Sequence, residues 1–276
     1  EFRALMTWGK ETGLKTVAFL HADSDTGREH LENVKIIAKA LDLQVVLPLP
    51  FKSDITDAQV DQLVQSILQT HPQMMFNHGS AGLYQKLITR ARQAGSKTNF
   101  MAVSSGSSQI AQGLGPLAEG MLFAQVVPSP WERKREITRE YQDAARRADA
   151  KADFTYAGME GFTTAKALVL TLRYSGIRIG DAVGLQKSHL KSDKLFLNTQ
   201  KSGSKIYVPL PKVAVEALAA LEPASGYFFW SGNGLRKSAV ADWQRALRRV
   251  FELAEVVGNP HVFQHTFATD LLSRGI

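Results

Sequence analysis

The feature that most constrains the fold is an alternation of short apolar runs with helical patterns between residues 15 and 127. Five runs have the length of strands, at 15–21, 44–49, 74–77, 99–103 and 120–127. Patterns with helical spacing follow the first three runs. Because each crossover helix must pack back over the sheet, this alternation predicts a mostly parallel sheet covered on both faces. The predicted fold class is α/β.

A second feature is a change of character near Arg178. Apolar spacing predicts an amphipathic helix over about 156–174, which Gly176 ends, and a second short helix follows Arg178. Downstream, the chain is mainly helical with one small β-hairpin. We therefore divide it into residues 1–168, a Rossmann-like parallel-sheet lobe, and residues 169–276, a mainly α fragment.

The net charge of +7 is unevenly divided between these modules. Residues 1–168 carry 19 Lys and Arg against 18 Asp and Glu, whereas residues 169–276 carry 14 against 8. The basic balance of the second module favours a polyanionic partner, most simply nucleic acid. A soluble basic surface without such a partner remains the alternative, because charge alone does not separate the two.

Composition bounds the remaining functional classes. The chain has no cysteine, which excludes disulfides, thiol catalysis and cysteine-ligated zinc. No apolar run reaches the ~18 residues of a membrane span, and the first residues lack the pattern of a secretory signal, so the expected compartment is the cytoplasm. No glycine-rich phosphate-binding loop is present, and we expect no cofactor.

Small polar residues follow three of the predicted strands. They stand in the triplets Asp25-Thr26-Gly27, His78-Gly79-Ser80 and Ser104-Ser105-Gly106. Ligands of parallel sheets bind beyond the carboxyl ends of the strands, so Thr26, Ser80 and Ser104 are candidates for hydrogen bonds to a small ligand. Taken singly, each triplet is better explained by turn formation and helix capping. Their joint appearance keeps the ligand interpretation open.

The first module resembles the second lobe of type I periplasmic binding proteins of the branched-chain amino-acid-binding group. The matching stretches are 17–46, 85–103 and 114–130, and the helix near 156–169 resembles the family's return helix. This resemblance implies a small ligand of the amino-acid type. Where amino-acid-binding members carry two aromatic residues and one acidic residue, this chain has Thr26, Ser80 and Ser104. Since the resemblance covers one lobe of two, we expect a ligand to make fewer contacts.

Between the modules, residues 131–151 alternate acidic with basic side chains. Pro128 and Pro130 stiffen the exit from the sheet that precedes this segment. The alternation predicts a helix with a solvated face, supported by pairs of opposite charge, and not a basic contact surface.

The second module carries basic and histidine residues in defined local settings. Lys201 lies between two predicted strands, 195–199 and 206–209, and therefore at the tip of a hairpin. A helix from Ser238 has a polar face with three arginines, Arg245, Arg248 and Arg249. The last predicted helix begins near Pro260, and three of its polar residues share a face, His261, Gln264 and His265.

These side chains have the chemistry needed to bind a phosphodiester. Arg178 donates in a fixed fork to phosphate oxygens, and Lys201 on a hairpin is suited to protonate a leaving alkoxide. Each also has a plainer explanation: a surface ion pair for Arg178, a turn residue for Lys201, and a capping or core residue for His261. A zinc site at His261 and His265 has a suitable helical spacing but lacks a third ligand.

Together these segments resemble the catalytic domain of tyrosine recombinases, the phage-integrase family. The resemblance covers residues 169–276 and rests on LTLRYSGIRIGDAVGL, KLFLNTQKSGSKIYVPLP and NPHVFQHTFATDLLSRGI. It implies that Arg178 is the first catalytic arginine, Lys201 the general acid and His261 the histidine that stabilises the transition state. In this motif Gln264 takes the place of the second arginine, and His265 follows it.

The resemblance also implies DNA as the partner, and breaking and rejoining of strands as the family's reaction. Gln264 cannot supply the forked charge of arginine, a loss that costs on the order of a hundredfold to a thousandfold in rate. Residues 169–276 hold no tyrosine in the position of the family's nucleophile. We therefore expect salt-sensitive DNA binding without strand cleavage. The alternatives are the ligand-binding lobe of an ABC-transporter substrate-binding protein, or a fusion of the two parts without a selected function.

Overall fold

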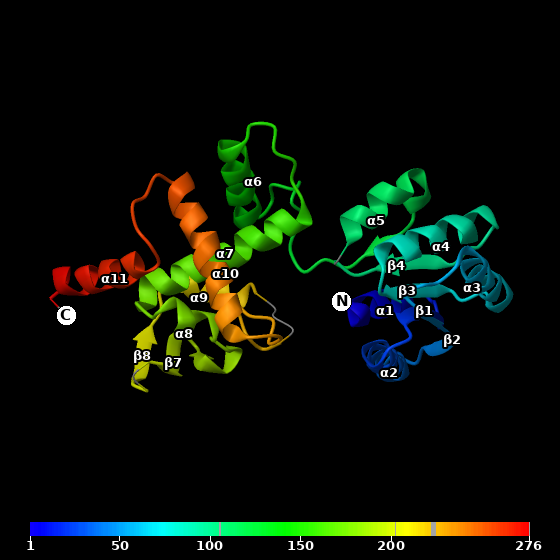
Figure 1. Cartoon of the computed structure of the whole chain (residues 1–276), viewed down its shortest axis with the longest axis horizontal. Coiled ribbons are helices and arrows are strands. Elements are labelled where there is room, and N and C mark those ends of the chain that lie inside the picture. The colour runs from blue at the N-terminus through cyan, green and yellow to red at the C-terminus, as the bar shows by residue number, and fades with distance from the viewer. Residues whose placement is uncertain (105, 202, 222–224, 276) are drawn as a thin grey trace. The chain divides into compact units, whose positions relative to one another are not determined.

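The computed structural model of this chain describes residues 1–104, 106–201, 203–221 and 225–275. The chain forms two compact units, Glu1–Pro128 and Ser129–Ile276 (Figure 1). The division at residue 168 drawn from the sequence falls elsewhere, inside the continuous helix α7 (Tyr156–Ser175). Because α7 packs against later helices of the second unit, its contacts assign the whole helix to that unit.

The first unit is built on a parallel sheet with the strand order β2-β1-β3-β4-β5. Its strands are β1 (Thr16–Ala22), β2 (Gln44–Phe51), β3 (Met74–His78), β4 (Asn99–Ala102) and β5 (Leu122–Phe123). Every pairing in it is parallel, which confirms the predicted sheet. The last strand is much shorter than the predicted run 120–127, because β4 offers it pairing only at Met101 and Ala102.

Helices cover both faces of this sheet. They are α1 (Phe2–Glu11), α2 (Asp25–Ala40), α3 (Asp57–Thr70), α4 (Ala81–Gln93) and α5 (Ser107–Leu114), followed by the 3-10 turn η1 (Gly115–Ala118). Apolar residues of α3, α4 and α5 pack on one face, with Val64 and Leu87 among them. α1 and α2 cover the other face through residues such as Met6 and Val34. Burial of both faces explains why the strands are largely apolar.

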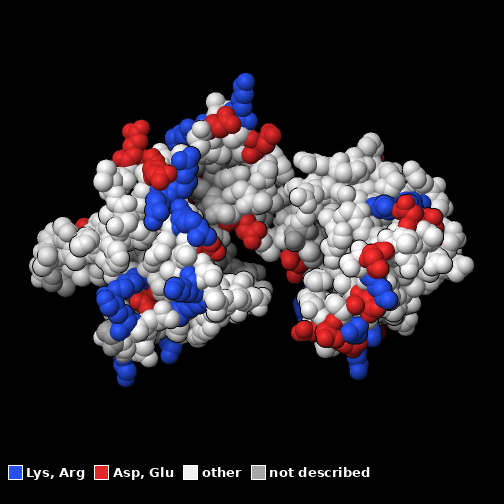
Figure 2. All heavy atoms as spheres, viewed as in Figure 1, with Lys and Arg blue, Asp and Glu red and all other residues white. Residues whose placement is uncertain are grey.

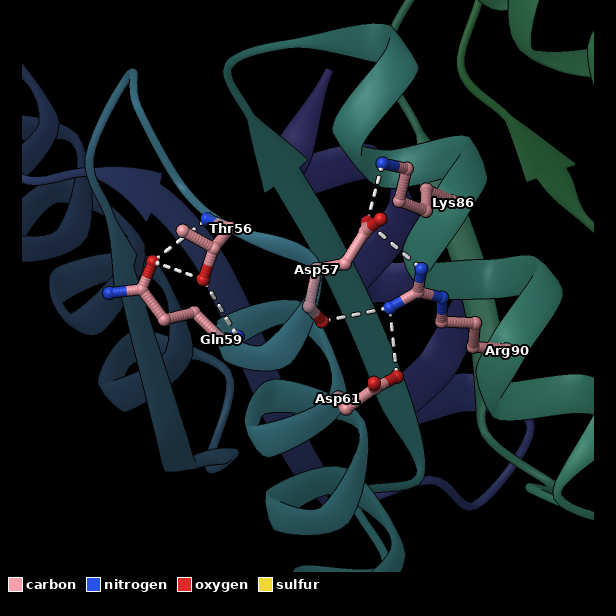
Figure 3. Close-up of polar contacts among 6 residues, drawn as sticks. All are labelled: Thr56, Asp57, Gln59, Asp61, Lys86 and Arg90. Atoms are coloured by element: carbon pink, nitrogen blue, oxygen red, sulfur yellow. Dashed lines mark hydrogen bonds and ion pairs between the residues drawn. The ribbon is translucent and has the colours of Figure 1, made fainter.

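The N-terminus of α3 is fixed by a capping box and by two basic residues of α4 (Figure 3). The Thr56 hydroxyl accepts a hydrogen bond from the Gln59 N–H, and the Gln59 side chain accepts one from the Thr56 N–H. Arg90 donates to both the carbonyl and the carboxylate of Asp57. A hydrogen bond and the charge of Lys86, followed by the charge of Arg90, lower the pKa of Asp57.

The second unit is mainly helical around one small antiparallel sheet. Besides α7, its helices are α6 (Glu136–Ala148), α8 (Ile179–Val183), α9 (Lys212–Ala219), α10 (Arg236–Leu253) and α11 (His261–Ser273), with the 3-10 turn η2 (Lys187–His189). The sheet has the order β6-β7-β8, from β6 (Leu190–Lys191), β7 (Lys194–Asn198) and β8 (Lys205–Pro209). Its core includes Leu168, Val183 and Leu218 from three different helices. The two units together confirm the predicted α/β class with a mainly α second part.

The charge pattern predicts a helix with a solvated face, and α6 has one. It also has a second, buried face and is therefore amphipathic. Tyr141 and Gln142 are buried on one side of it. The Gln142 amide donates to the Pro130 carbonyl, and Glu140 forms an ion pair with Lys166 of α7. α6 therefore packs onto the second unit, and its other charges occupy the remaining face.

Surface character follows the division into units. Glu1–Pro128 contains 11 Lys and Arg and 11 Asp and Glu, whereas Ser129–Ile276 contains 22 and 15. The whole net charge of +7 therefore lies in the second unit. On the face drawn in Figure 2, charges of both signs intermingle on the first unit, and basic side chains predominate around β7 and β8. No helix among the described residues combines the length and apolar character needed to cross a bilayer.

Candidate functional site

Arg178 lies at the N-terminal boundary of α8, directly after the turn that ends α7. That turn is made by Gly176, whose left-handed backbone (φ 64°) suits glycine, and it is anchored by the buried Ile177. The Arg178 side chain is exposed and makes no hydrogen bond or ion pair with the described residues. Its guanidinium is therefore available to an anionic ligand.

Lys201 lies in the turn between β7 and β8, and its side chain is exposed. A buried carboxylate joins this turn to α8, because Asp181 Oδ1 accepts a hydrogen bond of 2.8 Å from the Gln200 N–H. Asp181 is the third residue of α8 and is only 4% exposed. This bond holds the residue before Lys201 against the helix that Arg178 precedes.

His261 and Gln264 contact each other in the first turn of α11. The ring Nδ1 of His261 lies 2.9 Å from Gln264 Oε1. Gln264 Nε2 donates a hydrogen bond of 2.9 Å to the Gly176 carbonyl. The glutamine thus links α11 to the turn before Arg178, and it adds no charge to the site.

A pocket of about 240 Å³ opens at the start of α11. Its walls come from α8, α10, α11 and the loop before α11, through Ile179, Gln244, Arg248, Asn259, Pro260, His261 and Gln264. Ile179 directly follows Arg178, so the pocket adjoins the backbone at Arg178. One guanidinium, one imidazole and three amide side chains in these walls suit an oxyanion.

Sequence reasoning did not identify three residues of this site. Asp181 and Arg248 carried only weak signals: an acidic residue within a short apolar helix, and one arginine among three on a polar face. Asn259 accepts a hydrogen bond of 2.9 Å from the His261 N–H, and so fixes the start of α11. Only the general preference of asparagine for positions near helix N-termini pointed to it.

His265 does not join the pocket. It is exposed on α11 and contributes nothing to the pocket walls. Over the described part of the chain, no three His, Asp or Glu side chains are grouped closely enough to hold a metal ion. The zinc hypothesis for His261 and His265 therefore gains no third ligand there.

The candidate ligand residues of the first unit lie at one edge of the sheet, beyond β1, β3 and β4. Ser80 caps α4, since its Oγ accepts a hydrogen bond of 3.3 Å from a backbone N–H of that helix. The Ser104 N–H donates to the Glu1 carboxylate at 2.7 Å. Thr26 is exposed in the first turn of α2, and Ser105 lies outside the described residues. Contacts within the chain thus already engage two of the three predicted positions.

Three further polar residues lie near the same edge. The rings of His30 in α2 and His78 in β3 stack with their centroids 3.6 Å apart. Burial, and then the charge of His30, lower the pKa of His78. Asn77 Oδ1 is buried and has no hydrogen-bond partner within the described ranges. A buried acceptor of this kind is stabilised by any donor that reaches it.

Two family models match the chain and overlap in its middle. The model described as periplasmic binding protein matches residues 1–185. The model described as phage integrase family matches residues 122–276. Both resemblances inferred from the sequence are thereby confirmed.

Individual relatives divide in the same way. Tyrosine recombinase XerC of Mesorhizobium japonicum is 36% identical over 121 residues, which is 40% of this chain and 38% of that protein. An extracellular ligand-binding receptor from Verminephrobacter eiseniae superimposes with a TM-score of 0.52 at 20% identity, over 60% of this chain and 49% of the other. A possible leucine/isoleucine/valine-binding protein from Rhodopirellula baltica gives 0.51 at 24%, over 58% and 45%. The two structural likenesses show the fold alone, and the chain spans less than half the length of each of these relatives.

Proposed function

Because the chain belongs to the periplasmic binding protein family over residues 1–185 and to the phage integrase family over residues 122–276, we propose that its second unit is a recombinase-type module that binds duplex DNA. Charge supports this partner, since the second unit carries the whole net charge of the chain. Neutralising DNA phosphates supplies essentially all of the affinity of non-specific binding. Such a role puts the chain in the cytoplasm, with the DNA.

The observation that carries this proposal is the hydrogen bond from the hairpin tip to Asp181. It ties the turn that bears Lys201 to the helix that follows Arg178. Gln264 similarly ties the first turn of α11, where His261 stands, to the end of α7. Two side-chain bridges therefore connect the segments that hold the three family positions.

Each residue has a defined task in this proposal. Arg178 donates hydrogen bonds in a fixed fork to the non-bridging oxygens of a phosphate. Lys201 approaches an ester oxygen from the hairpin. His261, as an imidazolium, donates to the phosphate from Nε2, because its Nδ1 faces Gln264 Oε1. Gln264 offers a neutral N–H where the family has a second guanidinium. Because the loss of one forked charge costs on the order of a hundredfold to a thousandfold in rate, we expect this unit to bind DNA without strand cleavage.

Fluorescence anisotropy with a labelled duplex tests this proposal. We expect the dissociation constant to rise steeply with salt, and Arg178→Gln or Lys201→Gln to reduce the slope of this dependence by about one. Lys134→Gln, in the segment before α6, removes the same charge elsewhere in the unit and should have the smaller effect. A dissociation constant that does not change with salt concentration would overturn the proposal. Equal changes in the salt slope for all three substitutions would also overturn it.

We also infer that the two parent segments join within α7 near residue 168, so that residues 1–168 derive from the binding-protein lobe and residues 169–276 from the recombinase. The overlap of the two family matches over 122–185 supports a join inside this helix. Sequencing the genomic DNA across this region in independent isolates tests the inference. One uninterrupted reading frame would support a maintained fusion, whereas a break near codon 168 would identify a rearrangement.

A second candidate function is the binding of a small polar ligand by the first unit. The observation that favours it is the buried and unpaired Asn77 Oδ1 at the strand ends, which a ligand N–H or O–H would satisfy. Against it, contacts within the chain already engage Ser80 and Ser104. Titration calorimetry with free amino acids tests this candidate. Binding heat that is lost in Asn77→Ala would support this candidate. If none of the amino acids gives binding heat, an amino-acid ligand is excluded.

A further inference from the structure

Arg248 differs from its neighbouring arginines on α10 in lacking a charge partner. Arg245 forms an ion pair with Asp242, and Arg249 forms one with Glu252 at 3.3 Å. Arg248 is exposed and makes no ion pair with any residue that the structure describes. Its guanidinium therefore keeps all five N–H donors for a ligand.

The location of Arg248 is set by the residues that α10 buries. Leu247 and Phe251 are buried, and the Phe251 ring contacts the Phe263 ring of α11 with centroids 5.6 Å apart. Arg248 follows Leu247 and lies one helical turn after Gln244, so these two polar residues share a face. Both line the pocket at the start of α11.

The same pocket holds the glutamine that stands in place of the family's second arginine. Gln264 uses both ends of its amide, since Oε1 contacts His261 and Nε2 donates to the Gly176 carbonyl. Of the described residues that form the pocket walls, Arg248 is the only lysine or arginine. A positive charge thus reaches the pocket from α10, where α11 contributes a neutral amide.

We propose that this pocket binds one DNA phosphate and that Arg248 supplies the positive charge that Gln264 lacks. The proposal rests on DNA binding by the second unit and adds the location of one phosphate contact. The guanidinium fork matches two oxygens of a phosphate, which the point charge of a lysine does not. Gln244 is a neighbouring donor, and His261 as an imidazolium donates from Nε2, since its Nδ1 faces the Gln264 Oε1 acceptor.

The proposal is tested by measuring how tightly Arg248→Gln binds a labelled duplex, with fluorescence anisotropy as the readout, over a series of salt concentrations. We expect affinity to fall by about tenfold at low salt and the salt slope to decrease by about one. Arg245→Gln removes the same charge from the same helix, but that charge is already paired and exposed, so affinity should change by less than about twofold. Equal effects of the two substitutions, with wild-type binding still salt-dependent, would overturn the role of Arg248 and leave the proposed function intact. A wild-type chain without salt-dependent binding would overturn both.

Moving the charge separates a phosphate contact from a structural effect. In the Arg248→Gln background, Gln264→Arg should recover most of the lost affinity, because it returns a guanidinium to the pocket. Arg248→Lys should retain part of the affinity, since it keeps the charge and loses the fork. A double variant with an unchanged thermal unfolding midpoint and no recovered affinity would contradict the replacement of one charge by the other.

Inorganic phosphate gives a second measurement that does not depend on Gln264, which also holds α11 to α7. The ring resonances of His261 are followed by NMR while phosphate is added to the wild type and to Arg248→Gln. We expect a saturable shift in the wild type that is lost in the variant. Equal shifts in the two proteins would overturn the proposal.

Discussion

Phe267 of α11 packs its ring over Gly176, the residue that ends α7. A Cβ added at residue 176 would lie 2.4 Å from Phe267 Cδ1, and the Gln264 amide bonds the carbonyl of the same glycine. The last helix is therefore docked on the turn that leads into Arg178. A change in the backbone at Gly176 must affect both the packing of α11 and the pocket at its first turn.

Gly176→Ala should destabilise the second unit. The backbone at this position has φ of +64°, which costs an L-residue about 1–2 kcal/mol, and the new methyl group would also displace Phe267. We expect the free energy of unfolding, measured by urea titration, to fall by at least that amount. Gly161→Ala is the control, because this glycine lies within α7 with open space around it. Alanine at residue 161 should raise the free energy of unfolding by about 0.5–1 kcal/mol. A fall in the free energy of unfolding at both positions would contradict the docking of α11 on Gly176.

Asp181→Ala should loosen the hairpin tip. Its buried carboxylate accepts the Gln200 N–H, and loss of a hydrogen bond to a charged group costs about 1.5–3 kcal/mol. Because Lys201 follows directly, duplex binding should weaken about as much as in Lys201→Gln. Asp193→Ala, in the exposed turn before β7, changes the net charge equally and should have neither effect. Urea titration and anisotropy measure the two results, and unaltered affinity in Asp181→Ala would remove its positioning role.

Arg90→Ala should lower the unfolding temperature of the first unit more than Lys86→Ala. Arg90 donates three hydrogen bonds, to the carbonyl and carboxylate of Asp57 and to the carboxylate of Asp61, and its side chain is 28% exposed (Figure 3). Lys86 makes a single ion pair and is 50% exposed. Exposed single pairs contribute little to stability. Scanning calorimetry compares the variants, and the reverse order would mean that packing alone holds α4 on α3.

The parallel sheet was predictable because its strands are short, apolar and separated by helical patterns. Three α-helices escaped prediction: α5, which follows the fourth strand, and the two helices α1 and α9. In α1, Leu5 and Met6 are recognisable as core residues only once the sheet face that they cover is known. In α9, eight residues hold two buried positions, Ala214 and Leu218, which is too little for a periodicity to stand out. α1 and α9 therefore depend on tertiary packing that local spacing does not report.

The candidate site was predictable in its parts but not in its assembly. Motif and resemblance pointed to Arg178, Lys201 and His261 one at a time. The bond from the hairpin to Asp181 spans 19 residues, and the bond from Gln264 to the end of α7 spans 88. Periodicity describes neighbours within one element, so contacts between distant elements lie beyond its reach. The location of Arg248 in the pocket also depends on contacts between distant elements, so periodicity could not predict it.

The stacked rings of His30 and His78 predict that the stability of the first unit depends on pH. Burial, and then the charge of His30, lower the pKa of His78 from its ordinary value of 6.5. Both effects vanish in the unfolded chain, which therefore takes up the proton at a higher pH than the folded chain does. As the pH falls below about 6.5, the unfolded state binds more protons, and the free energy of unfolding must decrease.

His78→Gln should remove this contribution. Urea titrations from about pH 5 to about pH 8 should show wild-type stability declining, relative to the variant, below pH 6.5, and parallel curves above it. His30→Gln should keep part of the decline, because the burial of His78 persists after the repelling charge is gone. The quantity to compare is the difference in the free energy of unfolding between wild type and variant at each pH, because carboxylates such as Asp57 titrate at lower pH in all of these proteins. Wild-type and His78→Gln curves that stay parallel over the whole range would mean that the stacked pair has no linkage to folding.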